Sequence, residues 1–282
     1  MKNKILLLPM LLMVTACGNN EKLAQEMYNN AEQLYHAGQY VEATRWVDSI
    51  SATYPQEVET IRKGMLLQCH INQARYEKEL IEVDSLYNAT TAELTSLKSR
   101  FELHREGQEQ TYANYIYKGT RRKGEVSRSE VRVHVTENGD LQLTSVYCGG
   151  AKLNHTGIKV TMADGSTAQT SPIAYDGGKN YRYKSGDNTI EMVTYNLSQC
   201  EDVLQLISSH VGDKCKVEFT GGKQYNITLD KLSQEAIANS YRMAQLFVVA
   251  DSLQSRREFG IIQLELADRQ LIKLQEKENA TE

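Results

Sequence analysis

No run of about 18 apolar residues follows Cys17, so no later segment is long enough to cross a bilayer as a helix. Basic residues are not in excess either, since 32 lysines and arginines face 36 aspartates and glutamates, a formal charge of −4. Cleavage before Cys17 would remove Lys2 and Lys4 and no acid, which leaves 32 − 2 = 30 basic against 36 acidic residues and a charge of −6. Because nucleic-acid binding relies on lysine and arginine patches, we expect no nucleic-acid partner.

Motifs of catalysis and nucleotide binding are missing as well. The chain has no Gly-x-Ser-x-Gly, no His-Glu-x-x-His, no Walker-type Gly-Lys-Ser/Thr and no Cys-x-x-Cys. Six histidines are scattered along the chain, and Cys148 with His155 supplies two metal ligands where a site needs more. We therefore expect no catalytic residue, no enzyme activity, no cofactor and no metal site.

Cysteine is scarce too. Four cysteines follow Cys17, namely Cys69, Cys148, Cys200 and Cys215. Export permits disulfides, but four cysteines allow three pairings and the sequence does not select one. Cys200 and Cys215 are predicted at opposite ends of one short helix, which argues against that pair. Buried free thiols are the favoured interpretation, with disulfides as the alternative.

The N-terminal segment has the features of an export signal. A basic start is followed by the apolar residues 5–13, too few for a membrane span of about 20 residues, and by Val14-Thr15-Ala16-Cys17. That string resembles a bacterial lipobox. The resemblance implies that residues 1–16 are a signal peptide and that Cys17 is acylated as the mature N-terminus. An ordinary signal peptide with a chance cysteine is the alternative.

The lipoprotein resemblance also implies a location. Gly18, rather than an aspartate, follows the cysteine, which in lipoproteins favours the outer over the inner membrane. Several acyl chains together anchor a protein stably. We expect a lipid-anchored protein of the outer membrane in the cell envelope, with the periplasmic or the surface face left open.

Residues 17–55 carry the anchor and a predicted helical hairpin. The string Ala31-x2-Leu34-Tyr35-x2-Gly38-x-Tyr40-x-Glu42-Ala43 resembles one tetratricopeptide repeat, in which small residues let two helices approach. No second copy follows, and such repeats need about three units to form a solenoid. The segment is therefore expected to be a single antiparallel helix pair.

Two long helices are predicted, over residues 56–110 and 231–276, with residues 277–282 as a disordered tail. In both, apolar side chains recur at steps of three and four, as in a coiled coil. Their similar lengths favour antiparallel pairing into a stalk, with Tyr76 opposite Gly260 and Arg257 near Glu79 and Glu82. Two separate amphipathic helices that cover a β domain are the alternative.

Residues 111–230 have strand and turn chemistry. Segments such as 131–135 and 141–146 alternate apolar and polar side chains, and Asn-Gly, Asp-Gly and Gly-Gly pairs punctuate them. Eight or nine antiparallel strands and one short helix over residues 199–210 are expected, in a sandwich-like arrangement. The Gly-Gly-Lys string at 177–179 recurs at 221–223, which we interpret as two similar hairpin turns.

Tyrosine is the compositional oddity, with sixteen against four phenylalanines and one tryptophan. Two i, i+2 pairs, Tyr115 with Tyr117 and Tyr181 with Tyr183, each share a sheet face. A tyrosine-rich face could stack on sugar rings or hold a peptide. Cross-strand packing by residues of high β propensity is the favoured alternative.

Three Asp-Ser-apolar triplets place serines at Ser49, Ser85 and Ser252. They are similar to the Asp-Ser/Thr-apolar sequon of envelope O-glycosylation in one group of Gram-negative bacteria. The resemblance implies glycosylation of these serines, and chance matches of so short a motif are the alternative.

These patterns together predict an α+β fold, with a long antiparallel helical stalk, an N-terminal helical hairpin and an inserted β-sandwich-like domain. The expected function is that of a non-enzymatic envelope lipoprotein whose stalk presents the β domain to a protein partner. The alternative is a lipoprotein that binds a glycan or a peptide on its tyrosine-rich face. A deep pocket with convergent polar groups would favour ligand binding, and a flat exposed apolar patch would favour a protein partner. The oligomeric state is left open.

Overall fold

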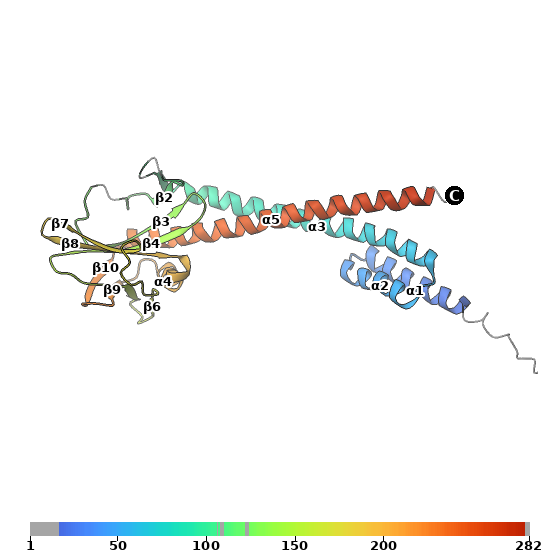
Figure 1. Ribbon diagram of the computed structural model, residues 1–282, viewed down its shortest axis with the longest axis horizontal. Coiled ribbons are helices and arrows are strands. Elements are labelled where there is room, and N and C mark those ends of the chain that lie inside the picture. Colours follow the sequence, from blue (N-terminus) through green and yellow to red (C-terminus); the bar gives the residue numbers. More distant parts are fainter. Residues whose placement is uncertain (1–16, 106, 108–109, 122–123, 280–282) are drawn as a thin grey trace, which may run out of the picture. The chain divides into compact units, whose positions relative to one another are not determined.

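A computed structural model describes residues 17–105, 107, 110–121 and 124–279. The predicted signal peptide and the last three residues of the predicted tail lie outside this description. Within it the chain forms five helices and two antiparallel sheets, an α+β fold as predicted (Figure 1). The chain divides into two compact units. Unit 1 is Met1–Leu86 with Leu253–Glu282, and unit 2 is Tyr87–Ser252.

Unit 1 begins with the predicted helical hairpin. Helix α1 (Cys17–His36) and helix α2 (Tyr40–Thr53) are joined by a turn in which Gly38 has a φ of +73°, a conformation that suits glycine. Ala31 and Ala43 are fully buried between the helices, because small side chains permit the close approach. No helix in the described part of the chain is long and apolar enough to cross a membrane.

Helix α3 (Val58–Lys98) and helix α5 (Lys231–Asn279) pair antiparallel within unit 1. Arg257 Nε donates to Asp84 Oδ1 at 2.6 Å, and Arg256 approaches Glu79 at 3.4 Å. Arg257 therefore pairs with Asp84 and not with the predicted Glu79 or Glu82. All four side chains are about half exposed, so these ion pairs contribute little to stability.

The register of this helix pair differs from the predicted one by about one turn. A Cβ at Gly260 would lie 2.9 Å from Leu80 Cδ2, so Leu80 fills the space at the glycine. Tyr76 was predicted there, but its ring lies edge-on to Phe259 at 6.3 Å. Leu80 is four residues after Tyr76 and shares its helix face, which is why the apolar spacing could not distinguish the two registers.

Both long helices end at positions other than those predicted. Helix α3 stops at Lys98 instead of residue 110, because Phe101 enters the core of unit 2 at 6% exposure and starts strand β1 (Phe101–His104). The alternation of Phe-Glu-Leu-His fits a strand as well as a helix. Helix α5 continues to Asn279 instead of ending at residue 276, because no glycine or proline interrupts it after Gly260.

Unit 2 contains two antiparallel sheets. The six-stranded sheet has the order β1, β2 (Asn114–Tyr117), β3 (Glu130–Thr136), β4 (Leu141–Gly149), β8 (Asn188–Asn196), β7 (Asn180–Ser185). The four-stranded sheet has the order β10 (Tyr225–Leu229), β9 (Cys215–Thr220), β5 (Gly157–Thr161), β6 (Thr167–Gln169). The described residues thus form ten strands, and the first of them lies before the predicted start of the β domain at residue 111.

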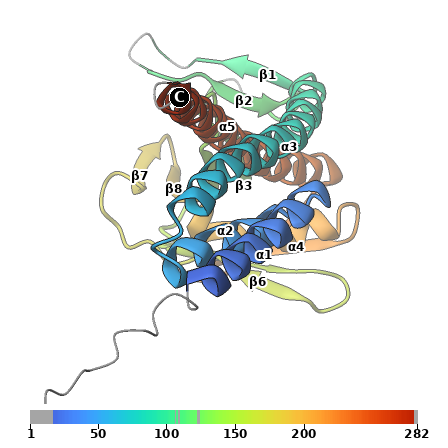
Figure 2. The same ribbon diagram turned by 90° about the vertical axis from the view of Figure 1, so that its right-hand side faces the viewer.

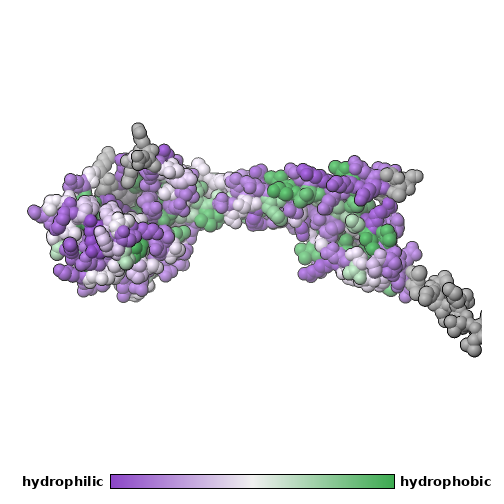
Figure 3. Space-filling model, viewed as in Figure 1, coloured by the Kyte–Doolittle hydropathy of each residue, from purple (hydrophilic) through white to green (hydrophobic). Residues whose placement is uncertain are grey.

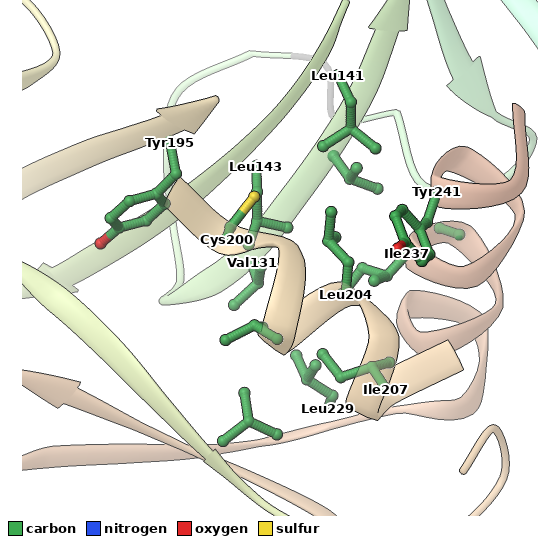
Figure 4. Packing of buried hydrophobic residues seen from close by; sticks show 14 of the residues in the cluster. Val131, Leu141, Leu143, Tyr195, Cys200, Leu204, Ile207, Leu229, Ile237 and Tyr241 are labelled. Atoms are coloured by element: carbon green, nitrogen blue, oxygen red, sulfur yellow. The ribbon is translucent and has the colours of Figure 1, made fainter. Parts of the chain in front are cut away.

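The core of unit 2 combines both sheets with helices. Helix α4 (Leu197–Ser209) places Leu204 and Ile207 against Leu229 of β10 and Ile237 of α5 (Figure 4). Its start is fixed by a capping box between Asn196 and Gln199. The first turns of α5 and the last turns of α3 are thus part of the core of unit 2. Figure 2 shows the β1–β2 hairpin directly after α3. For the last turns of α3 and the first turns of α5, the alternative from the sequence, amphipathic helices that cover the β domain, therefore applies.

The four cysteines after Cys17 are free, as predicted, and Cys69, Cys200 and Cys215 are buried, whereas Cys148 is half-buried instead of buried. Cys200 lies in α4, but Cys215 lies in β9 and not at the end of the helix as predicted, because the helix stops at Ser209. Burial raises the thiol pKa of Cys200 to about 12 and that of Cys215 to about 11. Both thiols are therefore protonated and unreactive at neutral pH.

Candidate functional site

A cavity of about 360 Å³ opens in unit 2 between strands β2 and β3 and the first turns of α5. This volume is in the range of small-ligand sites. Its apolar lining residues are Ile116, Val131, Val133 and Ala236. Its charged, amide and imidazole groups come from His104, Asn114, Arg121, Glu130, Arg132 and His134.

The cavity exists because β2 and β3 separate after a short common stretch. They are paired only at Asn114 with Thr136 and at Tyr115 with Val135. By contrast, β3 and β4 are paired at six positions, from Glu130 to Val135 on the β3 side. Beyond Tyr115, strand β2 stays paired with β1 up to Tyr117 but no longer with β3, and a turn in which Thr120 N–H donates to Tyr117 O at 3.1 Å then ends the strand. Among the described residues, one side of β3 is therefore without a neighbouring strand along the cavity.

The main chain of β3 faces the cavity at every second residue. Thr136 N–H donates to Asp140 O on the β4 side, whereas Glu137 N–H donates to Ala113 O on the β2 side. Because these directions alternate along a strand, the N–H and C=O groups of Val131 and Val133 point away from β4 and toward the cavity. In the described part of the chain no strand pairs with them on that side.

Asn114 supplies a second unpaired polar group. The residue is only 7% exposed, and its side-chain oxygen Oδ1 is buried with no hydrogen-bond partner among the described residues. A buried carbonyl oxygen without a partner costs about 1–3 kcal/mol. Asn114 lines the cavity, but its Oδ1 has almost no accessible surface. A ligand with a hydrogen-bond donor would remove that cost if the side chain turned its oxygen toward the cavity.

The charges around the cavity are partly compensated. Arg132 Nε donates to Glu130 Oε1 at 2.6 Å, and Arg128 Nε donates to Glu130 Oε2 at 3.2 Å. Arg121 is weakly paired, with its Nη1 3.9 Å from Glu102 Oε2. Of the charged lining residues, Arg121 and Arg132 against Glu130 give 2 − 1 = +1 with both histidines neutral. The site therefore has a small preference for acidic groups.

The four tyrosines predicted to bind a ligand do not form one surface. Tyr115 and Tyr117 lie on β2, which β3, β4 and β8 separate from the Tyr181 and Tyr183 strand β7. Tyr117 packs edge-on against Phe101 at 5.4 Å, and Tyr115 lies 6.4 Å from Phe247 of α5. For Tyr115 and Tyr117 the structure therefore agrees with the favoured alternative, in which strand tyrosines pack against their neighbours, because both side chains pack against the core of unit 2.

Tyr181 and Tyr183 stack on each other at the sheet edge, with ring centroids 6.3 Å apart and an interplanar angle of 14°. Tyr183 is 42% exposed, whereas Tyr181 O–H donates to Met192 Sδ at 2.8 Å. The pair lies at the opposite end of the strand order from the cavity and contributes no lining residue. The single tyrosine-rich binding face predicted from the sequence is therefore wrong.

A buried serine–histidine–glutamate chain lies between the β strands. Ser145 Oγ is 3.0 Å from His155 Nε2, and His155 Nδ1 is 3.2 Å from Glu191 Oε2. This connectivity matches that of hydrolase triads, but all three side chains are 0% exposed. A substrate could not reach Ser145, and the arrangement is a structural hydrogen-bond network.

Burial lowers the pKa of His155, although Glu191 counteracts the effect, and the ring is neutral at pH 7. Burial raises the pKa of Glu191, but hydrogen bonds from Asn154 N–H, Leu153 N–H and the His155 ring outweigh it, so the pKa is lowered and the carboxylate is ionised. Neutral His155 then donates from Nδ1 to Glu191 and accepts at Nε2 from Ser145. This network fixes the loop before β5 to β8.

The predicted modification sites are on helices. Ser49 on α2 is half-buried and donates to Arg45 O at 2.7 Å. Ser85 on α3 and Ser252 on α5 are exposed. Cys17 starts α1, but its side chain lies outside the description. In the part of the chain that the structure describes, no three histidine, cysteine or acidic side chains group as metal ligands.

Exposed apolar residues gather on the helices of unit 1, where Figure 3 shows green patches. On α5, Phe259, Ile262 and Leu266 are 56%, 54% and 44% exposed and follow the three-and-four spacing of one helix face. Such a stripe is typical of a surface on which another protein docks.

The residues of the cavity were not predicted from the sequence. One signal was present, because asparagine is depleted in strands and Asn114 stands in an otherwise apolar and aromatic strand. The separation of β2 from β3 has no comparable signal, since it depends on tertiary pairing. Comparison of the chain with protein-family profiles and with curated proteins gave no match.

Proposed function

We propose that this protein is a non-enzymatic lipoprotein of the cell envelope, anchored in the outer membrane through Cys17, that binds a partner protein through its β domain. The lipobox-like Val14-Thr15-Ala16-Cys17 supports the anchor. The binding role rests on one observation, the cavity between β2 and β3. It combines main-chain groups of β3 that no described strand pairs with, an amide oxygen of Asn114 that has no partner among the described residues, and apolar side chains.

Capture of a partner from the protein's own envelope tests this role. Ile116→Trp adds a large side chain at the half-buried position of β2 that lines the cavity. We expect this variant to lose the partners that the tagged wild-type chain captures, as measured by quantitative mass spectrometry. Ile227→Trp is the matched control, because Ile227 is a half-buried strand isoleucine in the other sheet.

The control variant should retain the captured partners. Equal capture by wild type and Ile116→Trp, with both chains folded by circular dichroism, would remove the cavity from the proposed function. Capture that is lost in both tryptophan variants would also count against it, because the effect would then not depend on the cavity.

The anchor has its own test. Cys17→Ser removes the thiol that an acyl chain would occupy, so we expect complete loss of the acylated form and release of the chain from the membrane fraction, or retention of an uncleaved precursor. Metabolic labelling with a fatty-acid analogue and membrane fractionation measure this. If the Cys17→Ser chain is cleaved normally and still found in the membrane fraction, the lipid-anchor proposal is wrong.

A further inference from the structure

The geometry points to an extended peptide segment, alternating apolar and acidic residues, as the occupant of the cavity, where it adds a strand between β2 and β3. This inference rests on the proposed function and specifies its partner. Strand addition uses main-chain hydrogen bonds for affinity and side-chain contacts for specificity. Both kinds of contact have identifiable groups in the cavity.

The main-chain contacts come from one side of β3. In the paired part of β2 and β3, Asn114 lies opposite Thr136 and Tyr115 opposite Val135. If the strands had stayed together in this register, Tyr117 would lie opposite Val133. The strands have separated before that point, and the N–H and C=O groups of Val131 and Val133 are directed into the gap. An inserted strand would bond to these groups, over a length of roughly 10–13 Å for residues 130–133.

The side-chain contacts differ on the two faces of the inserted strand. Val131 and Val133 are each 7% exposed and point into the core, toward the side of the sheet where Ser233 and Ala236 of α5 line the cavity. These small side chains leave room for an apolar side chain. The opposite face of β3 carries Glu130 and Arg132, which are paired with each other. Arg121 also lines the cavity, and this additional positive charge favours an acidic side chain. Alternation of apolar and acidic residues follows from the period of two along a strand.

A glycan fits the cavity less well. Proteins bind sugar rings by stacking them on aromatic side chains, and none of the lining residues is tyrosine, tryptophan or phenylalanine. A sugar also lacks the regular sequence of N–H and C=O groups that the exposed side of β3 requires. The buried Asn114 oxygen would accept either a peptide N–H or a hydroxyl, so it does not by itself distinguish the two.

The test uses the capped hexapeptide acetyl-Glu-Val-Glu-Val-Glu-Val-amide, fluorescently labelled, and the full chain carrying Cys17→Ser. We expect saturable binding by fluorescence polarisation, with NMR shifts confined to amides of β3 and Asn114. Methylation of alternate peptide nitrogens removes donors along one edge and should weaken binding at least tenfold. A lysine-for-glutamate peptide should also bind more weakly, because of the arginines.

Variants of the chain supply an independent measure. Asn114→Ala removes the acceptor oxygen and should weaken peptide binding by about tenfold. Asn226→Ala, at an exposed asparagine of β10 outside the cavity, is the control for the loss of an asparagine elsewhere in the β domain and should bind as wild type does. The N-methylated peptide is tested on the unaltered cavity, so the conclusion holds even where Asn114→Ala fails to fold.

The possible outcomes separate this inference from the proposed function. Absence of peptide binding, with partner capture still lost in Ile116→Trp, would overturn the peptide and leave the proposed function in place. Equal binding of plain and N-methylated peptides would exclude strand addition. Binding of a cell-wall oligosaccharide with shifts at Asn114, in place of the peptide, would assign the cavity to a glycan. Failure of both peptide binding and cavity-dependent capture would overturn both proposals.

Discussion

Replacing Glu191 by alanine is expected to lower the free energy of unfolding of unit 2 by about 3–5 kcal/mol. The Glu191 carboxylate is fully buried and accepts main-chain N–H groups from Leu153, Asn154 and His155 at 2.8, 2.9 and 3.1 Å. Its removal leaves these buried donors without an acceptor. Urea denaturation, followed by NMR signals of the β strands, measures the loss.

Two further substitutions show whether the buried carboxylate is responsible. Glu218→Ala, at a partly exposed position of β9, should change the free energy of unfolding by no more than about 0.5 kcal/mol. Glu191→Gln keeps one acceptor oxygen and should fall between the two alanine variants. A Glu191→Ala chain as stable as the Glu218→Ala chain would contradict the network.

The same network should make unit 2 sensitive to acid. The folded state lowers the pKa of His155 below its ordinary value of 6.5 and that of Glu191 below 4.5. In both cases the unfolded chain binds a proton at a higher pH than the folded chain does, so acid favours unfolding. Stability should decline as the pH falls below about 6.5 through His155 and again below about 4.5 through Glu191.

Gly222→Ala is expected to cost several kcal/mol, the second large effect. A Cβ at Gly222 would overlap the carbonyl oxygen of Leu153 and lie 2.8 Å from that of Asn154. Lys223 N–H also donates to Leu153 O at 3.0 Å, so the main chain there cannot shift away without losing this bond. Thermal or urea denaturation of the alanine variant measures the cost.

The repeated Gly-Gly-Lys string provides the control. Gly178 occupies the same place in its copy, but the nearest atom to a Cβ there is Asp176 Oδ1 at 3.9 Å, which is ordinary contact. Gly178→Ala should therefore leave stability within about 0.5 kcal/mol of wild type. Equal costs at both positions would mean that the turn conformation, and not the contact with Leu153, sets the requirement for glycine.

Much of the fold could be predicted from periodicity. Helices with an apolar face, strands with alternating burial and glycine turns all have local signals. Along β3, for example, buried and half-buried residues alternate as the sequence does. The errors arose where local signals are ambiguous. Phe101 fits the helical spacing and the strand alternation equally well, and only its burial against Tyr117 decides between them.

The candidate site was beyond prediction for a different reason. Its main-chain groups belong to Val131 and Val133, ordinary residues of a strand interior, and their availability depends on where β2 leaves β3. The tyrosine pairs had a compositional signal, but Tyr117 packs against Phe101 at β2 and Tyr181 stacks on Tyr183 at the β7 edge. Side-chain composition reports on surfaces made of side chains, and this cavity is partly lined by backbone.

The division of the chain has a consequence for the order of folding. Unit 1 is assembled from both ends of the sequence, whereas unit 2 is the continuous segment Tyr87–Ser252, which is 252 − 87 + 1 = 166 residues long. Closing so long a loop before unit 2 forms costs chain entropy. Once unit 2 is folded, the Glu93 and Arg242 side chains, on the helices near its two ends, are held 2.7 Å apart. The two sequence segments of unit 1 then no longer have to close a long loop to meet. We therefore expect the first half of unit 1 to stay without its second half until unit 2 has folded, so that unit 1 is completed after unit 2.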